Sequence, residues 1–300
     1  MRKTIARRVG VSLAAVTVLV GVTSCRDGSD KAAGAEPKSG TLAATQALTA
    51  AYKKTAAAKS AKVTMTMSVP ATMADGGETK MSGVMGWDPF VMDVTMSEKQ
   101  AGEPAGGAEK THMIWVDNAV YMDMGERPVE FDGKKWGKFD LGAAAEQSGD
   151  AALMKQMTAG LEDMNQDPAQ QLAMLLNSPD VKHLGAGEVD GRRAEHYKGS
   201  LTAEEGLKSN NSVKALKPEE RKALLANIKK AGIKGYDYDV WVNGDDYPVK
   251  MNVDIKTPQG TVHTTATYSD YGTKASVQAP PANDTVDLLK TLKELTTQRK

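Results

Sequence analysis

The chain has 300 residues, and its 38 basic and 38 acidic side chains give a formal net charge of zero at pH 7. Balanced charge argues against a nucleic-acid-binding protein, because such proteins need a basic face to contact phosphates. A single cysteine excludes an internal disulfide framework. Sixteen methionines and a low aromatic content are the unusual features of the composition.

Residues 1–24 have the order of an export signal. Residues 1–8 carry four basic side chains, and residues 9–22 hold only small or apolar ones. A helix that crosses a bilayer needs about 20 apolar residues, so a permanent membrane span is the weaker interpretation. The junction from Val22 to Cys25 resembles a bacterial lipobox, in which small residues precede a cysteine that receives diacylglycerol. The sequence therefore predicts a mature chain that begins at lipidated Cys25.

Lipidation of Cys25 decides where the chain works and what it contacts. The covalent acyl groups would anchor it to the outer face of the cell membrane, and no other cofactor is expected. Removal of the signal leaves 34 basic and 38 acidic residues, a mature charge of about −4. The twin Arg7-Arg8 leaves twin-arginine export open, but the flanking residues favour general secretion. An ordinary secretory signal that happens to contain a cysteine is the alternative.

Residues 25–40 form the predicted tether after the anchor. They are polar and rich in glycine, serine and alanine, so we expect a flexible coil that spans on the order of 20 Å. A folded domain then occupies residues 41–278 and opens with an alanine-rich helix over residues 42–59. A weak apolar face is expected on this helix, made of Leu42, Ala43, Ala47, Leu48 and Tyr52.

Strands follow in the first half of the domain. Apolar and polar residues alternate with a period of two over residues 63–69 and 90–97, as expected of strands with one buried face. Shorter strands are predicted over residues 111–116, 120–124 and 134–139. Their close spacing indicates an antiparallel meander.

The middle of the domain changes to helical spacing. One helix is predicted over residues 153–164 and another over residues 167–176, where Asp167 caps the start and a proline occupies the first turn. Two strands and two helices come next. They are predicted over residues 181–189, 193–201, 202–208 and 218–231.

The last part of the domain returns to strands. Three are predicted, over residues 236–242, 249–255 and 262–268, and an Asn-Gly pair between the first two is a hairpin signal. A proline-rich link and a C-terminal amphipathic helix capped by Asp284 occupy residues 279–300. These elements predict an α+β fold with one long antiparallel sheet and helices segregated against it.

Five segments carry a resemblance to a known family. They read FDGKKWGKFD at residues 131–140, GEVDGRRAEHYKG at 187–199, YDVWVNG at 238–244, YPVKM at 247–251 and YSDYG at 268–272. They resemble the actinobacterial lipoproteins related to the mycobacterial LppX/LprG group and to LolA. That resemblance implies a curved antiparallel β half-barrel with helices across its concave face and a hydrophobic cavity between them. Several members bind or carry acylated lipids, and no catalytic residue is implied.

Motifs for catalysis and metal binding are missing from the sequence. The four histidines lack metal-ligand spacing, and no nucleophile elbow, Walker loop or dinucleotide motif is found. Asp237 and Asp239 share one face of a predicted strand. They could form a catalytic carboxylate pair or a calcium-binding ledge, or they could belong to a solvated outer face. We favour the solvated face. We therefore expect no metal site and a protein that is not an enzyme.

Methionines recur on the predicted strands and helices. Thioether side chains adapt to irregular apolar partners, so they either fill an ordinary core or line a cavity for acyl chains. Together with the family resemblance they indicate a candidate lipid cavity. Its candidate lining residues are Met65, Met67, Met92, Val94, Met96, Met113, Met122, Met124, Met154, Met157, Leu224, Ile228, Val240, Met251 and Val253.

The sequence favours one function and leaves a second open. The first is a membrane-anchored lipoprotein that non-covalently binds an acylated lipid or lipoglycan and transports or presents it in the cell envelope. The alternative is an interaction or sensor module in which the half-barrel holds a segment of a partner protein. No motif identifies that partner.

Overall fold

The computed structural model describes residues 39–73, 76–102, 110–125, 133–148, 167–209, 213, 217–273 and 276–291. The export signal, Cys25, most of the tether and the helix predicted over residues 153–164, with Met154 and Met157, lie outside these residues.

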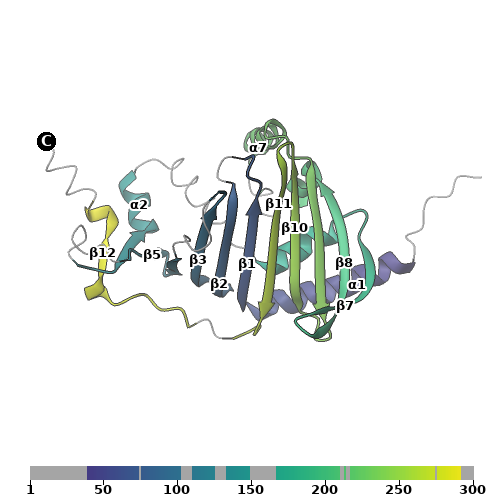
Figure 1. The fold of residues 1–300 in the computed structure, drawn as a ribbon, viewed down its shortest axis with the longest axis horizontal. Coiled ribbons are helices and arrows are strands. Elements are labelled where there is room, and N and C mark those ends of the chain that lie inside the picture. Colours follow the sequence, from purple (N-terminus) through teal and green to yellow (C-terminus); the bar gives the residue numbers. More distant parts are fainter. Residues whose placement is uncertain are drawn as a thin grey trace, which may run out of the picture. The chain divides into compact units, whose positions relative to one another are not determined.

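One sheet of twelve strands forms the framework (Figure 1). Its order is β12-β6-β5-β4-β3-β2-β1-β11-β10-β9-β8-β7, and all neighbours are antiparallel except β12 and β6. The strands are β1 (Ser60–Val69), β2 (Gly77–Trp87), β3 (Phe90–Gln100), β4 (Lys110–Val116), β5 (Ala119–Asp123), β6 (Trp136–Asp140), β7 (Lys182–Val189), β8 (Arg192–Thr202), β9 (Gly235–Asn243), β10 (Pro248–Thr257), β11 (Gly260–Ser269) and β12 (Thr285–Asp287). Because β12 and β7 do not pair with each other, the sheet is open, and the predicted α+β class is confirmed.

Three helices, α1, α4 and α5, pack on one face of the sheet, where α1 crosses the strands in Figure 1. α1 contacts α4 and β7, α4 contacts β8, and α5 contacts β8 and β9. The described helices are α1 (Ser39–Ala58), α2 (Leu141–Ser148), α4 (Pro168–Leu176), α5 (Ala203–Ser209) and α7 (Pro218–Lys230). As predicted, Asp167 caps α4, since its carboxylate accepts a hydrogen bond from the Ala169 amide at 2.8 Å. We call the helix-covered face the inner face and the opposite one the outer face.

Of the residues predicted for the apolar face of α1, Leu48 is buried and Ala47 packs against the core, but the other three are exposed. Ala44, Leu48 and Ala51 are fully buried, whereas Leu42 is 52% and Tyr52 36% exposed. Small alanines let the helix approach α4 closely, and the two larger side chains point away from that contact. The prediction for Leu42 and Tyr52 was wrong because alanine gives a weak periodicity signal against larger apolar residues.

The main core lies between the inner face and helices α1 and α4. Alternate residues of the strands point into it, as their period of two predicts. Its buried members include Leu48, Met92, Leu172, Leu175 and Val240, each 0% exposed. A second, smaller cluster forms on the outer face, where Ile114, Val116, Ala119, Tyr121 and Trp136 pack together and Val277 packs against them. Both faces of this part of the sheet are therefore partly covered.

The C-terminal segment differs from the prediction. Residues Thr285–Asp287 form β12, which pairs in parallel with β6, and the next helical turn starts after them. Asp287 accepts a hydrogen bond from the Lys290 amide at 3.0 Å, whereas Asp284 accepts one from the Lys135 amide at 2.9 Å. Asp284 therefore fixes the loop before β6 and does not cap the helix.

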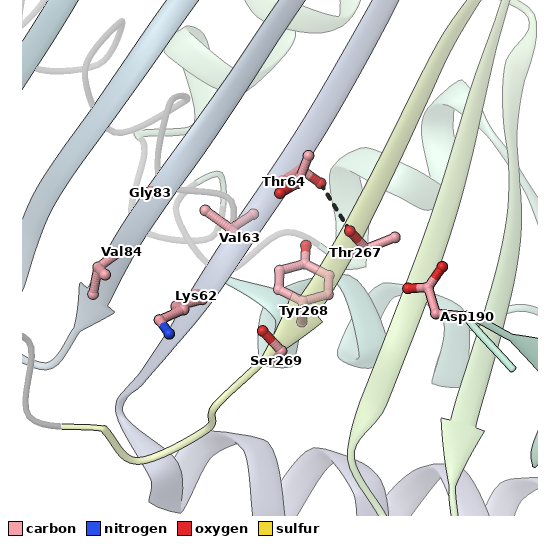
Figure 2. Close-up of a pocket in the computed structure, with 9 residues that line it drawn as sticks. All are labelled: Lys62, Val63, Thr64, Gly83, Val84, Asp190, Thr267, Tyr268 and Ser269. Atoms are coloured by element: carbon pink, nitrogen blue, oxygen red, sulfur yellow. Dashed lines mark hydrogen bonds between the residues drawn. The ribbon is translucent and has the colours of Figure 1, made fainter. Parts of the chain in front are cut away.

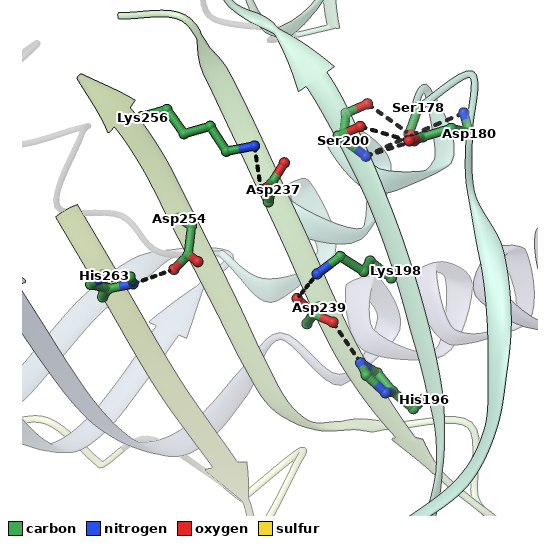
Figure 3. A network of polar contacts seen from close by, with 10 residues as sticks. All are labelled: Ser178, Asp180, His196, Lys198, Ser200, Asp237, Asp239, Asp254, Lys256 and His263. Atoms are coloured by element: carbon green, nitrogen blue, oxygen red, sulfur yellow. Dashed lines mark hydrogen bonds and ion pairs between the residues drawn. The ribbon is translucent and has the colours of Figure 1, made fainter. Parts of the chain in front are cut away.

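A carboxylate joins the end of α4 to the sheet on the outer side of β8 (Figure 3). Asp180 accepts hydrogen bonds from the Ser178 hydroxyl at 2.6 Å and from the amide and hydroxyl of Ser200, both at 2.7 Å. Burial on its own would raise the pKa of Asp180, but these hydrogen bonds outweigh it and hold the pKa below the ordinary value of 3.8. The ionised form is therefore the one the fold favours.

This arrangement predicts an acid-sensitive link. A carboxyl whose folded pKa is depressed adds stability above its unfolded pKa, and that stability is lost as the pH falls through the folded pKa. Thermal unfolding of the Asp180→Asn variant should therefore show a lower Tm than the native chain at neutral pH. The difference should shrink below about pH 4, the usual carboxyl range. A Tm difference that stays constant from neutral to acid pH would contradict this role.

Candidate functional site

A cavity of about 240 Å³ lies between the inner face and helices α4 and α5. We call it the inner cavity. Its lining combines apolar and aromatic side chains with a few neutral polar groups. The residues are Gln170, Gln171 and Met174 of α4, Gly206 and Leu207 of α5, Tyr236 and Tyr238 of β9, Val253 and Ile255 of β10, and Thr264 of β11.

Strand register brings the sheet side of the lining together. In the β10 ladder, Val253 pairs with Tyr238 and Ile255 with Tyr236, while Thr264 pairs with Val253 from the other side. Because residues two apart share a face, all five point toward the helices. Their position therefore follows from the pairing of three strands that are consecutive in the sequence.

Gly206 allows α5 to approach this part of the sheet. A Cβ atom at this position would lie 2.9 Å from the ring of Tyr236, closer than Cβ atoms normally come to other groups. A larger residue would force the ring or the helix to move. The aromatic ring therefore packs directly under the helix backbone and forms one wall of the inner cavity.

Neutral groups line the inner cavity. Burial raises the pKa of both Tyr236 and Tyr238, and the neighbouring Tyr236 adds to the rise at Tyr238. Both phenols therefore stay protonated throughout the physiological range. None of the lining residues carries a charged side chain. Ligand sites typically combine apolar and aromatic side chains with a small number of polar groups, and the uncharged lining of the inner cavity has this composition.

A row of methionines continues the inner face beyond the inner cavity. Strand register aligns Met251 of β10, Ala266 of β11 and Met65 of β1, and then Met81 of β2 and Met96 of β3. Met251 and Met81 are buried, and Met65 and Met96 are only partly buried and pack against the same core. The row therefore joins β10 to β3 through flexible, polarisable side chains.

The predicted lining residues occupy several different places. Val253 lines the inner cavity. Five others belong to the buried core: Met92, Val94, Met113, Val240 and Met251. The remaining described candidates are partly or largely exposed. Met65, Met67, Met96 and Met124 lie on or beside the strands and are partly exposed, and Met122 is 39% exposed. Leu224 and Ile228 lie on α7 and are also partly exposed. The set therefore does not form a single pocket within the described residues.

Sequence reasoning missed the tyrosines of the inner cavity. Tyr236 and Tyr238 alternate with Asp237 and Asp239 on β9 and share a face with Val240, which was among the candidates. Period two was therefore the signal that could have identified them. The contributions of Met174 and Leu207 depend on how helices α4 and α5 pack, and periodicity alone does not give this.

A second hollow, of about 440 Å³, lies against the outer face (Figure 2). Lys62, Thr64, Thr267 and Ser269 contribute to its wall from neighbouring strands, and Asp190 contributes from the β7–β8 turn. Lys62 is already paired with Asp270 at 2.7 Å. This hollow is larger than the inner cavity, but its lining includes the charged side chains of Lys62 and Asp190, which an acyl chain cannot use.

The acidic pair on β9 is neutralised by basic neighbours (Figure 3). The Asp237 carboxylate forms an ion pair with the Lys256 ammonium at 2.7 Å. The Asp239 carboxylate lies 2.7 Å from Nε2 of His196 and 3.0 Å from Nζ of Lys198. Both carboxylates therefore belong to a cross-strand network of the outer face. Among the described residues, no cluster of three or more histidine, cysteine or acidic residues could hold a metal ion.

Two Streptomyces proteins are similar to the chain over most of its length. No family model matches. The "Uncharacterized 31.2 kDa protein in rplA-rplJ intergenic region" of Streptomyces griseus is 32% identical over 258 residues, which cover 83% of this chain and 80% of that protein. The chain belongs to the same family as this protein. The "Putative lipoprotein SCO4650" of Streptomyces coelicolor is 26% identical over 96% of both chains.

Two solved lipoprotein structures are similar to this chain. LprF from Mycobacterium bovis is 14% identical, covers 80% of this chain and 98% of its own, and gives a TM-score of 0.46. The lipoprotein LppX from Mycobacterium tuberculosis is 10% identical. The match covers 79% of this chain and 99% of LppX, with a TM-score of 0.43. The fold class is established by the strand order itself. Within the described residues, no helix has both the length and the apolar character required to cross a membrane.

Proposed function

We propose that the protein is a lipoprotein held by lipidated Cys25 on the outer face of the cell membrane. We further propose that it binds an acylated lipid or lipoglycan non-covalently in the inner cavity, and that it transports or presents this lipid in the envelope. The lipobox-like junction supports the anchor. A full-length Streptomyces coelicolor relative that is described as a lipoprotein supports it independently.

The observation that carries the lipid proposal is the uncharged lining of the inner cavity. Burial of each methylene group contributes about 0.8 kcal/mol, so an acyl chain gains affinity from apolar walls without any charged partner. Val253, Ile255 and Leu207 supply such walls, and the Met174 thioether adapts to the shape of the chain. The hydroxyl of Thr264 and the amides of α4 provide neutral polar contacts.

The size of the inner cavity limits what it holds in the described conformation. Sites that enclose a whole small-molecule ligand have volumes of about 300 Å³ or more, and the inner cavity has about 240 Å³. It therefore accommodates part of one acyl chain, with the headgroup outside. Longer chains would extend along the methionine row, where Met65 and Met96 are only partly buried and thioether side chains adapt to a ligand's shape.

Native mass spectrometry of the mature lipidated protein tests this proposal. The protein would be extracted from its own membrane in mild detergent, and masses would be measured before and after denaturation. We expect a non-covalent adduct with the mass of an acylated lipid, lost on denaturation, in addition to the covalent mass at Cys25. Observation of the covalent mass alone, even after incubation with envelope lipids, would overturn the lipid proposal and favour a protein ligand.

A further inference from the structure

The stretch from Lys217 to Lys234, which contains α7, has a charge opposite to that of the mature chain. It holds six basic and two acidic residues, a net charge of +4, whereas the chain after Cys25 has a net charge of about −4. Arg221, Lys222, Lys229 and Lys230 are all exposed. Among the described residues, none of these four forms an ion pair within 4 Å, although Glu204 of α5, which is paired with Lys208 at 3.1 Å, also lies in the field of Lys229. The charges of Arg221, Lys222 and Lys230, and part of that of Lys229, are therefore available to an external partner.

The apolar side of α7 is incompletely covered. Leu224, Leu225 and Ile228 lie on one side of the helix, at positions i, i+1 and i+4, and all three are only partly buried. No side chain of α7 that the structure describes is buried. Arg221 and Lys229 flank this apolar side in the sequence. Half-exposed leucines beside lysines and arginines are typical of helices that lie at a membrane surface.

α7 lies at the end of the sheet where β10 turns into β11 (Figure 1). Its last turn is followed by Gly232, which lies against Pro258 of that turn, and the Lys234 amide donates a hydrogen bond to the Lys256 carbonyl at 2.9 Å. α7 also packs against α5, which contributes Gly206 and Leu207 to the inner cavity. The basic helix is therefore fixed at the same end of the fold as the α5 wall of the cavity.

We infer that α7 docks on the anionic surface of the phospholipid bilayer and turns the α5 end of the inner cavity toward the lipids. This inference rests on the proposed lipid-binding function, since an acyl chain must leave the bilayer to enter the cavity. Phosphate headgroups complement the basic charge on the exposed side of α7, where Lys222, Ala226 and Lys229 lie. The covalent anchor alone would hold the domain near the membrane without orienting it.

A single fluorescent label on α7 tests the orientation while the anchor holds the protein on the membrane. The exposed Ala226 is replaced by cysteine and labelled with an environment-sensitive dye. Cys25, acylated in the mature protein, has no free thiol to react. The protein is reconstituted on vesicles of phosphatidylcholine with or without phosphatidylglycerol. A matched probe at Asp245→Cys marks the exposed loop at the other end of β9.

We expect a blue shift and brightening at position 226 on vesicles that contain phosphatidylglycerol, and none at position 245. The signal should fall in about 1 M salt, where the Debye length is about 3 Å. Reversal of Lys229 and Lys230 to glutamate should lower the ratio of docked to free α7 more than about tenfold, since each basic residue near an anionic surface contributes about fivefold. The same reversal at the exposed Lys53 and Lys182 should leave the ratio unchanged.

Three results would overturn the inference: no response at position 226, the same response on neutral vesicles, or the same response after charge reversal at Lys229 and Lys230. Flotation of the protein with neutral vesicles measures anchoring separately from docking. Protein without a covalent lipid would not float with these vesicles. A response at position 226 with no lipid adduct in the mass spectrum would keep the docking and overturn only the cavity proposal.

Discussion

A chain with Cys25 replaced by alanine should leave the cell membrane and accumulate in the culture medium. The thiol is the single attachment point for the proposed acyl groups, because the sequence contains no other cysteine. One acyl chain alone gives only marginal membrane binding, and a chain with no acyl group loses this contribution completely. Fractionation of cells followed by immunoblotting would measure the shift, and mass spectrometry of the native chain would show the covalent lipid.

The control for this experiment is Ser24→Ala, which keeps a small residue before the cysteine and should leave the protein in the membrane fraction. Membrane retention of the Cys25→Ala chain to the same extent as the native chain would contradict the anchor. Retention with an uncleaved signal would identify residues 9–22 as an alternative attachment, and the mass of the chain distinguishes this case.

Replacing Thr264 with tryptophan should abolish retention of the acylated lipid while the fold persists. Thr264 lines the inner cavity, and the indole ring would occupy much of its 240 Å³. The neighbouring Thr265 points to the outer face, so Thr265→Trp adds the same bulk without entering the cavity. Native mass spectrometry should show the lipid adduct on the Thr265→Trp chain and not on the Thr264→Trp chain.

Comparison of the two chains separates loss of binding from loss of structure. Overpacking typically costs about 1–3 kcal/mol, so the Tm of Thr264→Trp is measured beside that of Thr265→Trp. An undiminished lipid adduct on a folded Thr264→Trp chain would place the lipid elsewhere, with the methionine row around Met65 and Met96 as the next region to block.

Local patterns in the sequence predicted most of the individual strands. Alternation of apolar and polar residues predicted β1 and β3, and turn residues predicted the β4–β5 and β7–β8 hairpins. In these turns Asp117, Asn118, Asp190 and Gly191 have positive φ angles. β2 was not among the predicted strands. Gly77, Gly83 and Gly86 interrupt its apolar alternation, and a Cβ at Gly83 would collide with the backbone of β3. The close approach of β2 to β3 requires glycine at this position, and glycine interrupts the alternation by which a strand is predicted.

The site was less predictable than the fold because it depends on contacts between distant segments. β1 pairs with β11, about two hundred residues later in the chain, and this pairing creates the methionine row. The methionines indicated an apolar inner face, but most of the buried ones fill the core. The inner cavity depends on how closely α5 approaches Tyr236, which a single glycine controls. Periodicity identifies a face and does not reveal where that face is left unfilled.

The two borders of the sheet gain importance when many copies share one membrane. Tethering raises the effective concentration of neighbouring molecules, and unpaired strand edges then favour intermolecular β pairing and aggregation. β12 occupies the free side of β6. At the opposite border, the register of β7 shifts between His183 and Gly185, leaving Leu184 as an exposed bulge residue. Bulges disrupt edge pairing, and β12 leaves a free edge of only three residues at the other border, so both borders are poorly suited to pairing with a second copy.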